Sequence, residues 1–260
     1  MTAALSSCHE NQSPSSQEAE VEEAVAAPGR FVGAKTAFAK CMGWIRDRAL
    51  TLVLMLCFGL FLTGQLLTGQ AEFNSTQREH GAAALTFAAY MQTGHPWEAV
   101  FENWESEFLQ MAVFILLTTR LVQKGSPESR RPGVIEPVDV DARDFAGHPE
   151  APWPVRRGGW ILRLYENSLG LAFVVLFLLS WAGHALGGFA DYADDQMQHG
   201  ESSPSLADYL TSSRFWFESF QNWQSEFLAI AAMVWLAVYL RQRGSPESKP
   251  VWAPHDETGR

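Results

Sequence analysis

Two stretches of the sequence nearly repeat each other: FENWESEFLQMAVFILLTTRLVQKGSPES at 101–129 and FQNWQSEFLAIAAMVWLAVYLRQRGSPES at 220–248. The offset between Phe101 and Phe220 is 119 residues. Each copy begins with aromatic and acidic residues, continues through an apolar run, and ends at a basic residue followed by Gly-Ser-Pro-Glu-Ser. An apolar run with an aromatic start and a basic end is typical of a membrane-spanning helix. The sequence therefore predicts the same membrane helix twice.

Two further stretches, at 49–67 and 168–186, are apolar and contain no formal charge. Each is close to the ~20 residues that a helix needs to cross the hydrocarbon core. With spans at about 101–122 and 220–240, they predict an all-α integral membrane four-helix bundle built from two tandem helical-hairpin repeats. An even number of spans in each repeat gives both repeats the same orientation, so a pseudo-twofold axis along the membrane normal should relate them.

The remaining segments follow from this division of the chain. Residues 1–43 are rich in Ser, Glu and Gln and predict a disordered cytoplasmic tail. Repeat 1 covers 44–129 with an outer loop at 68–100, and repeat 2 covers 160–248 with an outer loop at 187–219. Between them, 130–159 is a Pro-rich acidic linker, and 249–260 forms a C-terminal tail.

The charge distribution predicts the orientation of the spans. The net charge of −10 is no signature of nucleic-acid binding. Basic residues gather at the termini and at the linker ends of the spans, whereas the two loops within the hairpins hold only Arg78 and Arg214 against many carboxylates. By the positive-inside rule, both termini and the linker are cytoplasmic. The acidic loops should then face outward, and with no cysteine in these loops we expect no disulfide.

The pattern Phe-x-Asn-Trp-x-Ser-Glu-Phe-Leu followed by Gly-Ser-Pro-Glu-Ser, present in both copies, resembles a family of uncharacterised bacterial multi-pass membrane proteins known as a domain of unknown function. The resemblance covers roughly 44–248. It implies a four-span protein of the bacterial inner membrane, and it implies no activity, substrate or cofactor.

A polar wedge lies on one face of the second span, near its outer end, and recurs on the fourth. At 100° per residue its members fall within a narrow arc. The wedge consists of Asn103, Ser106, Glu107 and Gln110, with Asn222, Ser225 and Glu226. If the two helices flank the axis, Glu107 and Glu226 approach each other and share a proton or hold a cation. The alternative is that these groups cap and complement the helix starts at the wet interface.

Aromatic residues near the outer ends predict anchoring at the membrane interface. The predicted anchors are Tyr90, Trp97, Trp104, Tyr209, Trp216 and Trp223. His184 in the third span occupies the place of Gln65 in the first, and we expect it to hydrogen bond across helices. His80 and His199 lack a second histidine or a cysteine at ligand spacing, so no metal or other cofactor is predicted.

The sequence contains no Walker loop, dinucleotide fingerprint, HExxH, CxxC or GxSxG motif. It therefore predicts a non-enzymatic structural or interaction module of the inner membrane. The alternative is a small proton or cation transporter, or a channel component, that acts as an oligomer through Glu107 and Glu226. Expected partners are the lipid bilayer and a second copy or another membrane protein, and not nucleic acid.

Overall fold

The computed structural model describes residues 40 and 42–259, and all regular structure in these residues is helical. The predicted disordered tail at 1–43 lies almost wholly outside the described residues. The chain divides into two compact units, 1–65 and 66–260, and each is described by itself.

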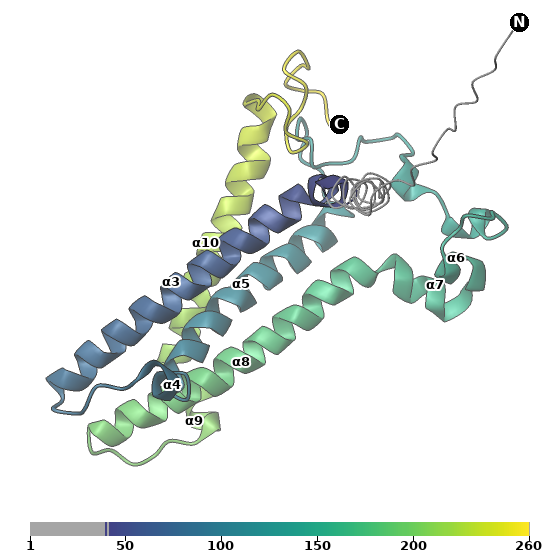
Figure 1. The fold of residues 1–260 in the computed structure, drawn as a ribbon. Coiled ribbons are helices and arrows are strands. Elements are labelled where there is room, and N and C mark those ends of the chain that lie inside the picture. The colour runs from purple at the N-terminus through teal and green to yellow at the C-terminus, as the bar shows by residue number, and fades with distance from the viewer. Residues whose placement is uncertain (1–39, 41, 260) are drawn as a thin grey trace, which may run out of the picture. The chain divides into compact units, whose positions relative to one another are not determined.

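The first unit contains the start of α3 (Ala49–Glu79), whose large apolar side chains up to Phe61 are exposed. The second unit contains the end of α3, a short α4 (Phe87–Tyr90) and the long α5 (His95–Thr118). After the linker come α8 (Ser168–Gln198), α9 (Leu206–Leu210) and α10 (Ser213–Tyr239). α5 packs chiefly against α8 and also contacts α10, while α9 lies against α8 and α10 (Figure 1).

By length and composition, two helices of the described chain, α3 and α8, are apolar enough to cross a membrane. Such evidence suggests membrane association only weakly, so the predicted four-helix membrane bundle is confirmed only as an all-helical fold with two candidate spans. α5 and α10 do not meet the same criterion. The first thirteen residues of α5 include four carboxylates, Glu98, Glu102, Glu105 and Glu107, which leaves a short apolar part.

Both candidate spans are longer than predicted. The predicted outer loops began at 68 and 187, but α3 continues to Glu79 and α8 to Gln198. These segments are polar, yet they contain no proline, so the helices continue beyond the apolar run. Each helix is followed by a glycine with φ of 74°, Gly81 and Gly200, a backbone conformation that favours glycine and ends a helix.

The linker at 130–159 contains short helical elements. It contains two 3₁₀ helices, Pro137–Asp139 and Ala142–Phe145, and the short helix α6 (Trp153–Arg157), which precedes α7 (Gly159–Glu166). Ala151, Val155 and Leu162 form a small buried cluster there. The prolines limit the length of these helices but do not prevent this local packing.

The repeated Gly-Ser-Pro-Glu-Ser segments form closed turns. In the first, Ser129 Oγ accepts a hydrogen bond of 2.9 Å from the backbone N–H of Gln123, and in the second, Ser248 Oγ accepts one of 2.9 Å from Gln242. The C-terminal tail then folds back, because the N–H of Gly125 donates to Thr258 Oγ1. The final serine of each segment thus has a structural role that a helix stop alone does not require.

Glycines let the start of α5 pack directly on the backbone of α8. A Cβ added at Gly187 would lie 2.7 Å from the backbone nitrogen of Glu98, and one at Gly183 would lie 2.5 Å from the ring of Phe101. Gly94 in turn meets the backbone carbonyl of Gly187. Small residues spaced four apart permit this kind of close helix contact in membrane proteins.

Replacing Gly187 with alanine should therefore lower the thermal stability of the detergent-solubilised protein. The added methyl overlaps the Glu98 backbone, and overpacking of this kind costs about 1–3 kcal/mol. The matched control is Gly170→Ala on the same helix, where the new Cβ would lie 3.7 Å from Leu116, an ordinary contact. Circular dichroism melting curves compare the variants, and equal melting temperatures for Gly187→Ala and the unmodified protein contradict the close packing.

Candidate functional site

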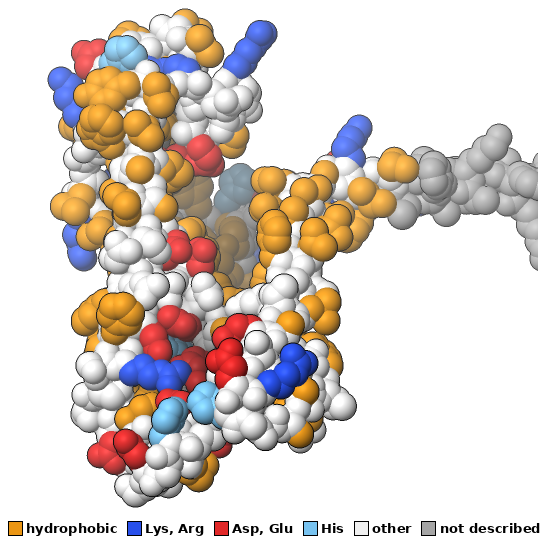
Figure 2. Space-filling view, turned by 90° about the vertical axis from the view of Figure 1, so that its left-hand side faces the viewer, with side chains coloured by type: hydrophobic (Ala, Val, Ile, Leu, Met, Phe, Trp, Pro, Cys, Tyr) orange, Lys and Arg blue, Asp and Glu red, His pale blue; other side chains and the backbone are white. Residues whose placement is uncertain are grey.

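Charged side chains from α5, α8 and α10 converge at one end of the second unit. We call this group the buried cluster, and it consists of Glu98, Glu102, Glu105, His184, Asp191, Arg214 and Glu218. Figure 2 shows acidic, basic and histidine side chains gathered around a hollow at the lower end of the view, with hydrophobic side chains covering much of the surface above it. Five of the seven residues are acidic, so the cluster has an excess of negative charge.

Arg214 at the start of α10 contacts three carboxylates. Its Nη2 lies 3.2 Å from Glu98 Oε1 and 2.8 Å from Asp191 Oδ2, and its Nε lies 2.9 Å from Glu218 Oε1. Glu98 comes from α5 and Asp191 from α8, so one guanidinium joins three helices. One positive charge cannot balance three ionised carboxylates, so the cluster favours the arrival of a further positive charge, either a proton or a cation.

His184 lies at the centre of the buried cluster and its side chain is 0% exposed. Its Nδ1 lies 3.1 Å from Glu105 Oε2. Because an ionised carboxylate only accepts hydrogen bonds, this contact assigns a proton to Nδ1. Its Nε2 has no hydrogen-bond partner among the described residues, and the Oε2 of Glu218 lies 3.7 Å away.

Glu105 is also fully buried and is held from two sides. One oxygen faces His184, and the other accepts a hydrogen bond of 3.2 Å from the indole Nε1 of Trp223 on α10. A buried carboxylate requires such partners, because desolvation disfavours its charge. These contacts fix the orientation of the imidazole ring and direct Nε2 toward Glu218.

The burial of the cluster changes the pKa of its outer members and of the neighbouring Tyr209. Burial, together with the negative charge of Asp191, raises the pKa of Glu98 to about 8, although Arg214 acts in the opposite sense. Burial and the same glutamate raise the pKa of the Tyr209 hydroxyl well above its ordinary value. Burial opposes the charge of Arg214, but Glu98, Asp191 and Glu218 outweigh it and raise the pKa of the guanidinium. Arg214 therefore stays charged.

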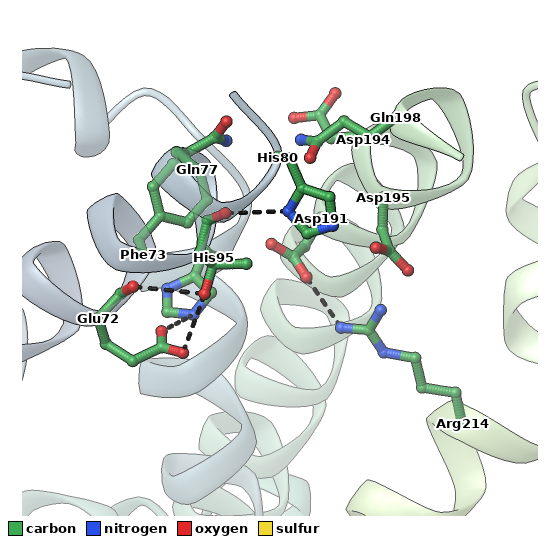
Figure 3. Close-up of a pocket in the computed structure, with 11 residues that line it drawn as sticks. Glu72, Phe73, Gln77, His80, His95, Asp191, Asp194, Asp195, Gln198 and Arg214 are labelled. Carbon is green, nitrogen blue, oxygen red and sulfur yellow. Dashed lines mark hydrogen bonds and ion pairs between the residues drawn. The ribbon is translucent and has the colours of Figure 1, made fainter. Parts of the chain in front are cut away.

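A pocket of about 280 Å³ opens beside the buried cluster. Figure 3 shows its acidic and histidine lining, with Asp191 and Arg214 on one wall and His95 and Glu72 on the other. Asp191 and Arg214 belong to both the pocket and the cluster. The pocket therefore leads to the cluster through this ion pair. Its lining residues are Glu72, Phe73, Thr76, Gln77, His80, His95, Asp191, Asp194, Asp195, Gln198 and Arg214.

The 119-residue offset also relates contacts around the pocket. His80 and His199, which occupy equivalent positions, pack edge to face with ring centroids 5.7 Å apart. The Nδ1 of each ring lies 2.9 Å from the carbonyl of the residue four positions earlier. His95 Nε2 lies 3.5 Å from Glu72 Oε2, and these two residues occupy the positions equivalent to Arg214 and Asp191, which form an ion pair.

The structure divides the predicted polar wedge. Ser106 and Gln110 are buried, Asn222 and Glu226 are half-buried, and the others, Asn103, Glu107 and Ser225, are exposed. Ser106 and Ser225 each donate to a backbone carbonyl three residues earlier in their own helix. Gln110 donates to the backbone carbonyl of Glu226 at 2.8 Å, which links α5 to α10. Exposed Glu107 lies outside the buried cluster, and the proton or cation site predicted at Glu107 and Glu226 stays a prediction.

Two of the predicted interfacial anchors have buried side chains. Tyr90 is 1% exposed and Tyr209 is 0% exposed. Their hydroxyls bond to His95 Nδ1, at 3.0 Å, and to Glu218, at 3.4 Å. Polar neighbours for the hydroxyl make full burial of a tyrosine favourable.

The predicted tryptophan anchors lie in more open positions. Trp97 and Trp216 are exposed, and each donates its indole N–H to a backbone carbonyl at 3.0 Å. Trp104 and Trp223 are half-buried.

Sequence reasoning placed His184 in a polar contact across helices, and the structure confirms such a contact with Glu105 on α5. It missed the rest of the cluster. Glu98, Glu102 and Glu105 follow a spacing of four and three residues, which places them on one face of a helix. Arg214, the lone basic residue of the second outer loop, was a further signal. Both features were visible in the sequence, but nothing in the sequence indicated that Arg214 and these glutamates are in contact.

Replacing Glu105 with alanine should destabilise the protein strongly, because it leaves His184 and Trp223 without their buried partner. Breaking a buried pair in this way costs about 3–5 kcal/mol. The matched control is Gln224→Ala, 119 residues later, where the exposed side chain donates only to a backbone carbonyl of its own helix. Thermal unfolding in detergent measures both, and a Glu105→Ala variant as stable as Gln224→Ala contradicts the assignment.

Comparison with known proteins gives a family and no function. No curated protein and no solved structure matches the chain. One family model matches residues 41–260, which include every residue of the buried cluster and of the pocket. The chain belongs to the family described as Domain of unknown function (DUF6766).

Proposed function

We propose that this chain is a multi-pass inner-membrane protein that binds a cation in the buried cluster. The observation that carries the proposal is the excess of carboxylates around Arg214, next to a buried His184 with a free ring nitrogen among the described residues. Buried carboxylates are stable when they are paired or when they coordinate a metal ion. The pocket provides a route to the cluster from solvent.

The membrane setting rests on the exposed apolar faces. Leu176, Leu178 and Leu179 on α8 are exposed, as are Trp235 and Leu236 on α10. Contiguous apolar faces of this kind mark contact with lipid or another protein. We place both termini and the linker in the cytoplasm and the pocket on the outer side, because basic residues concentrate near the opposite ends of these helices.

We propose that the two halves are tandem repeats. The supporting observation is the agreement between equivalent hydrogen bonds, such as those of Trp97 and Trp216 or of Ser129 and Ser248. α3 and α8 also begin and end at positions 119 residues apart. Within this frame the cation site is asymmetric, because His184 and Glu218 correspond to Gln65 and Ala99.

A structural or interaction module is the second candidate, and one observation favours it. Arg214 already contacts three carboxylates, so the network holds α5, α8 and α10 together without any added ion. In that case the network would serve as an internal brace, and the exposed apolar faces would contact a second copy or another membrane protein.

The proposed orientation predicts opposite labelling of two engineered cysteines. In a background with Cys8, Cys41 and Cys57 replaced by serine, Ser203→Cys lies in the outer loop and Glu150→Cys in the linker, both exposed. A membrane-impermeant maleimide should label Ser203→Cys in intact cells and Glu150→Cys only after lysis. Labelling of both in intact cells, or of the linker alone, contradicts the topology.

Cation binding predicts saturable stabilisation of the purified protein. Melting temperatures are measured in detergent against Na⁺, K⁺, Ca²⁺, Mn²⁺ and Zn²⁺ after treatment with a chelator. A cation that binds the folded state stabilises it by about 2.7 kcal/mol at one hundred times its dissociation constant. At least one of these ions should raise the melting temperature.

The variants separate the two possible sites. Combined Glu98→Gln and Glu218→Gln should abolish the stabilisation, and combined Glu107→Gln and Glu226→Gln should preserve it. No stabilisation by any ion overturns cation binding and leaves the structural module. If the stabilisation is lost only in the combined Glu107→Gln and Glu226→Gln variant, the cation binds at the polar wedge.

A further inference from the structure

We propose that Glu98, His184 and Glu218 together bind a divalent first-row transition-metal ion. This inference rests on the cation-binding function proposed above and names the class of ion and its ligands. The three residues each offer one ligand atom, and these atoms lie within 4.8 Å of one another. They come from α5, α8 and α10, so the ion would join the same three helices that Arg214 joins.

The free nitrogen of His184 is the first argument. Its Nε2 is buried and has no hydrogen-bond partner among the described side chains and backbone atoms. A buried polar atom without a partner costs about 1–3 kcal/mol, so its presence in a native site needs a reason. A metal ion that accepts the lone pair of Nε2 supplies that reason, since neutral imidazole is a common metal ligand.

The distance to Glu218 is the second argument. Nε2 of His184 and Oε2 of Glu218 are 3.7 Å apart, which is too long for a hydrogen bond. Zinc binds histidine nitrogen and carboxylate oxygen at about 2.0–2.2 Å, so two ligands of one tetrahedral ion lie roughly 3.4 Å apart. The observed separation therefore needs only a small adjustment to accommodate an ion between the two atoms.

Glu105 orients the ring of His184 from the side opposite Nε2. A metal-binding histidine usually donates its other ring N–H to a carboxylate, which fixes the tautomer and increases the basicity of the ligand. His184 has this arrangement, with Nδ1 against Glu105 and Nε2 directed at Glu218. Trp223 in turn holds Glu105. Glu105 is therefore a positioning residue, and it does not contact the ion.

The donor set selects the class of ion. One imidazole nitrogen with two carboxylate oxygens suits zinc, manganese, iron or cobalt, whereas calcium and magnesium prefer sites made of oxygen alone. Cysteine is absent from the cluster, so the ligands do not favour copper(I).

Arg214 already compensates part of the negative charge of the proposed ligands. It contacts Oε1 of both Glu98 and Glu218, so in Glu218 the ion would bind Oε2, which also accepts a hydrogen bond of 3.4 Å from the Tyr209 hydroxyl. It also lines the pocket with Asp191, where Glu72, Asp194 and Asp195 add negative charge. This acidic lining attracts a divalent cation from solvent and holds it beside the cluster. Displacement of part of the Arg214 contact would then admit the ion.

The test is direct binding of Zn²⁺ and Co²⁺ to the full-length protein purified in detergent and stripped with a chelator. Equilibrium dialysis with elemental analysis should give one ion per chain, and Co²⁺ should develop a visible absorption band of a protein-bound ion. His184→Gln, which introduces the residue found 119 positions earlier, should weaken Zn²⁺ binding at least tenfold, and so should Glu218→Gln. Glu105→Gln should weaken it about 10–100-fold and shift the Co²⁺ band.

The matched control is His95→Gln, a histidine of the pocket that lies outside the proposed ligand set and contacts Tyr90 and Glu72. The affinity of His95→Gln for Zn²⁺ should stay within about twofold of that of the unmodified protein, because His95 neither binds the ion nor contacts its ligands. Melting curves of each variant without metal show whether it is folded. If His184→Gln does not fold, Glu98→Gln replaces it in the comparison.

Three results overturn the inference, and they differ in what they leave standing. Zn²⁺ binding that is unchanged in both His184→Gln and Glu218→Gln places the metal elsewhere. If Na⁺ or Ca²⁺ stabilises the protein but Zn²⁺ and Co²⁺ do not bind, the transition-metal inference is wrong and the proposed cation site stands. No binding of any cation removes both proposals and leaves His184 as a proton-bearing partner of Glu105 and Glu218.

Discussion

The contact between His184 and Glu105 is the constraint on which the rest of the second unit depends. Both side chains are 0% exposed, and they come from different helices. A carboxylate and an imidazole away from water are stable only with partners in fixed places. Trp223 must then reach Glu105 from α10, and α5 must approach α8 closely. Glycines at 183, 187 and 188 make that approach possible, because any Cβ there would collide with α5 or with Tyr209.

Much of the helical fold follows from the sequence. Apolar runs, glycines with positive φ and the Gly-Ser-Pro-Glu-Ser ends all act locally, so they predict helices and stops without knowledge of the tertiary structure. The lengths of α3 and α8 were harder to predict. A polar segment without proline is compatible with loop or helix, and the choice depends on neighbours such as Leu85, whose carbonyl accepts hydrogen bonds from Gln70 and Asn74.

The candidate site was less accessible to prediction. The wedge residues lie within α5 and α10, but the assumption that matching residues meet across an axis selected Glu107 and Glu226. The buried contacts instead join unlike residues, such as Glu105 with His184 and Glu98 with Arg214. Periodicity identifies which residues share one face of a helix. It does not identify which residues of another helix this face contacts. Tyr90 and Tyr209 show the same limit, since an anchor and a buried tyrosine have the same local sequence.

The asymmetry between His184 and its counterpart Gln65 bears on stoichiometry. Two identical hairpins around an axis would create two identical sites, or a single site lying on the axis itself. Substitution at equivalent positions gives one half His184 and Glu218 and the other half Gln65 and Ala99. Under the proposed tandem-repeat architecture, the chain would resemble a heterodimer fused into one polypeptide, in which one half provides the imidazole and the other provides Glu98 and Glu105. The proposed cation site, with one copy per chain and away from the axis, would require no second subunit to complete it.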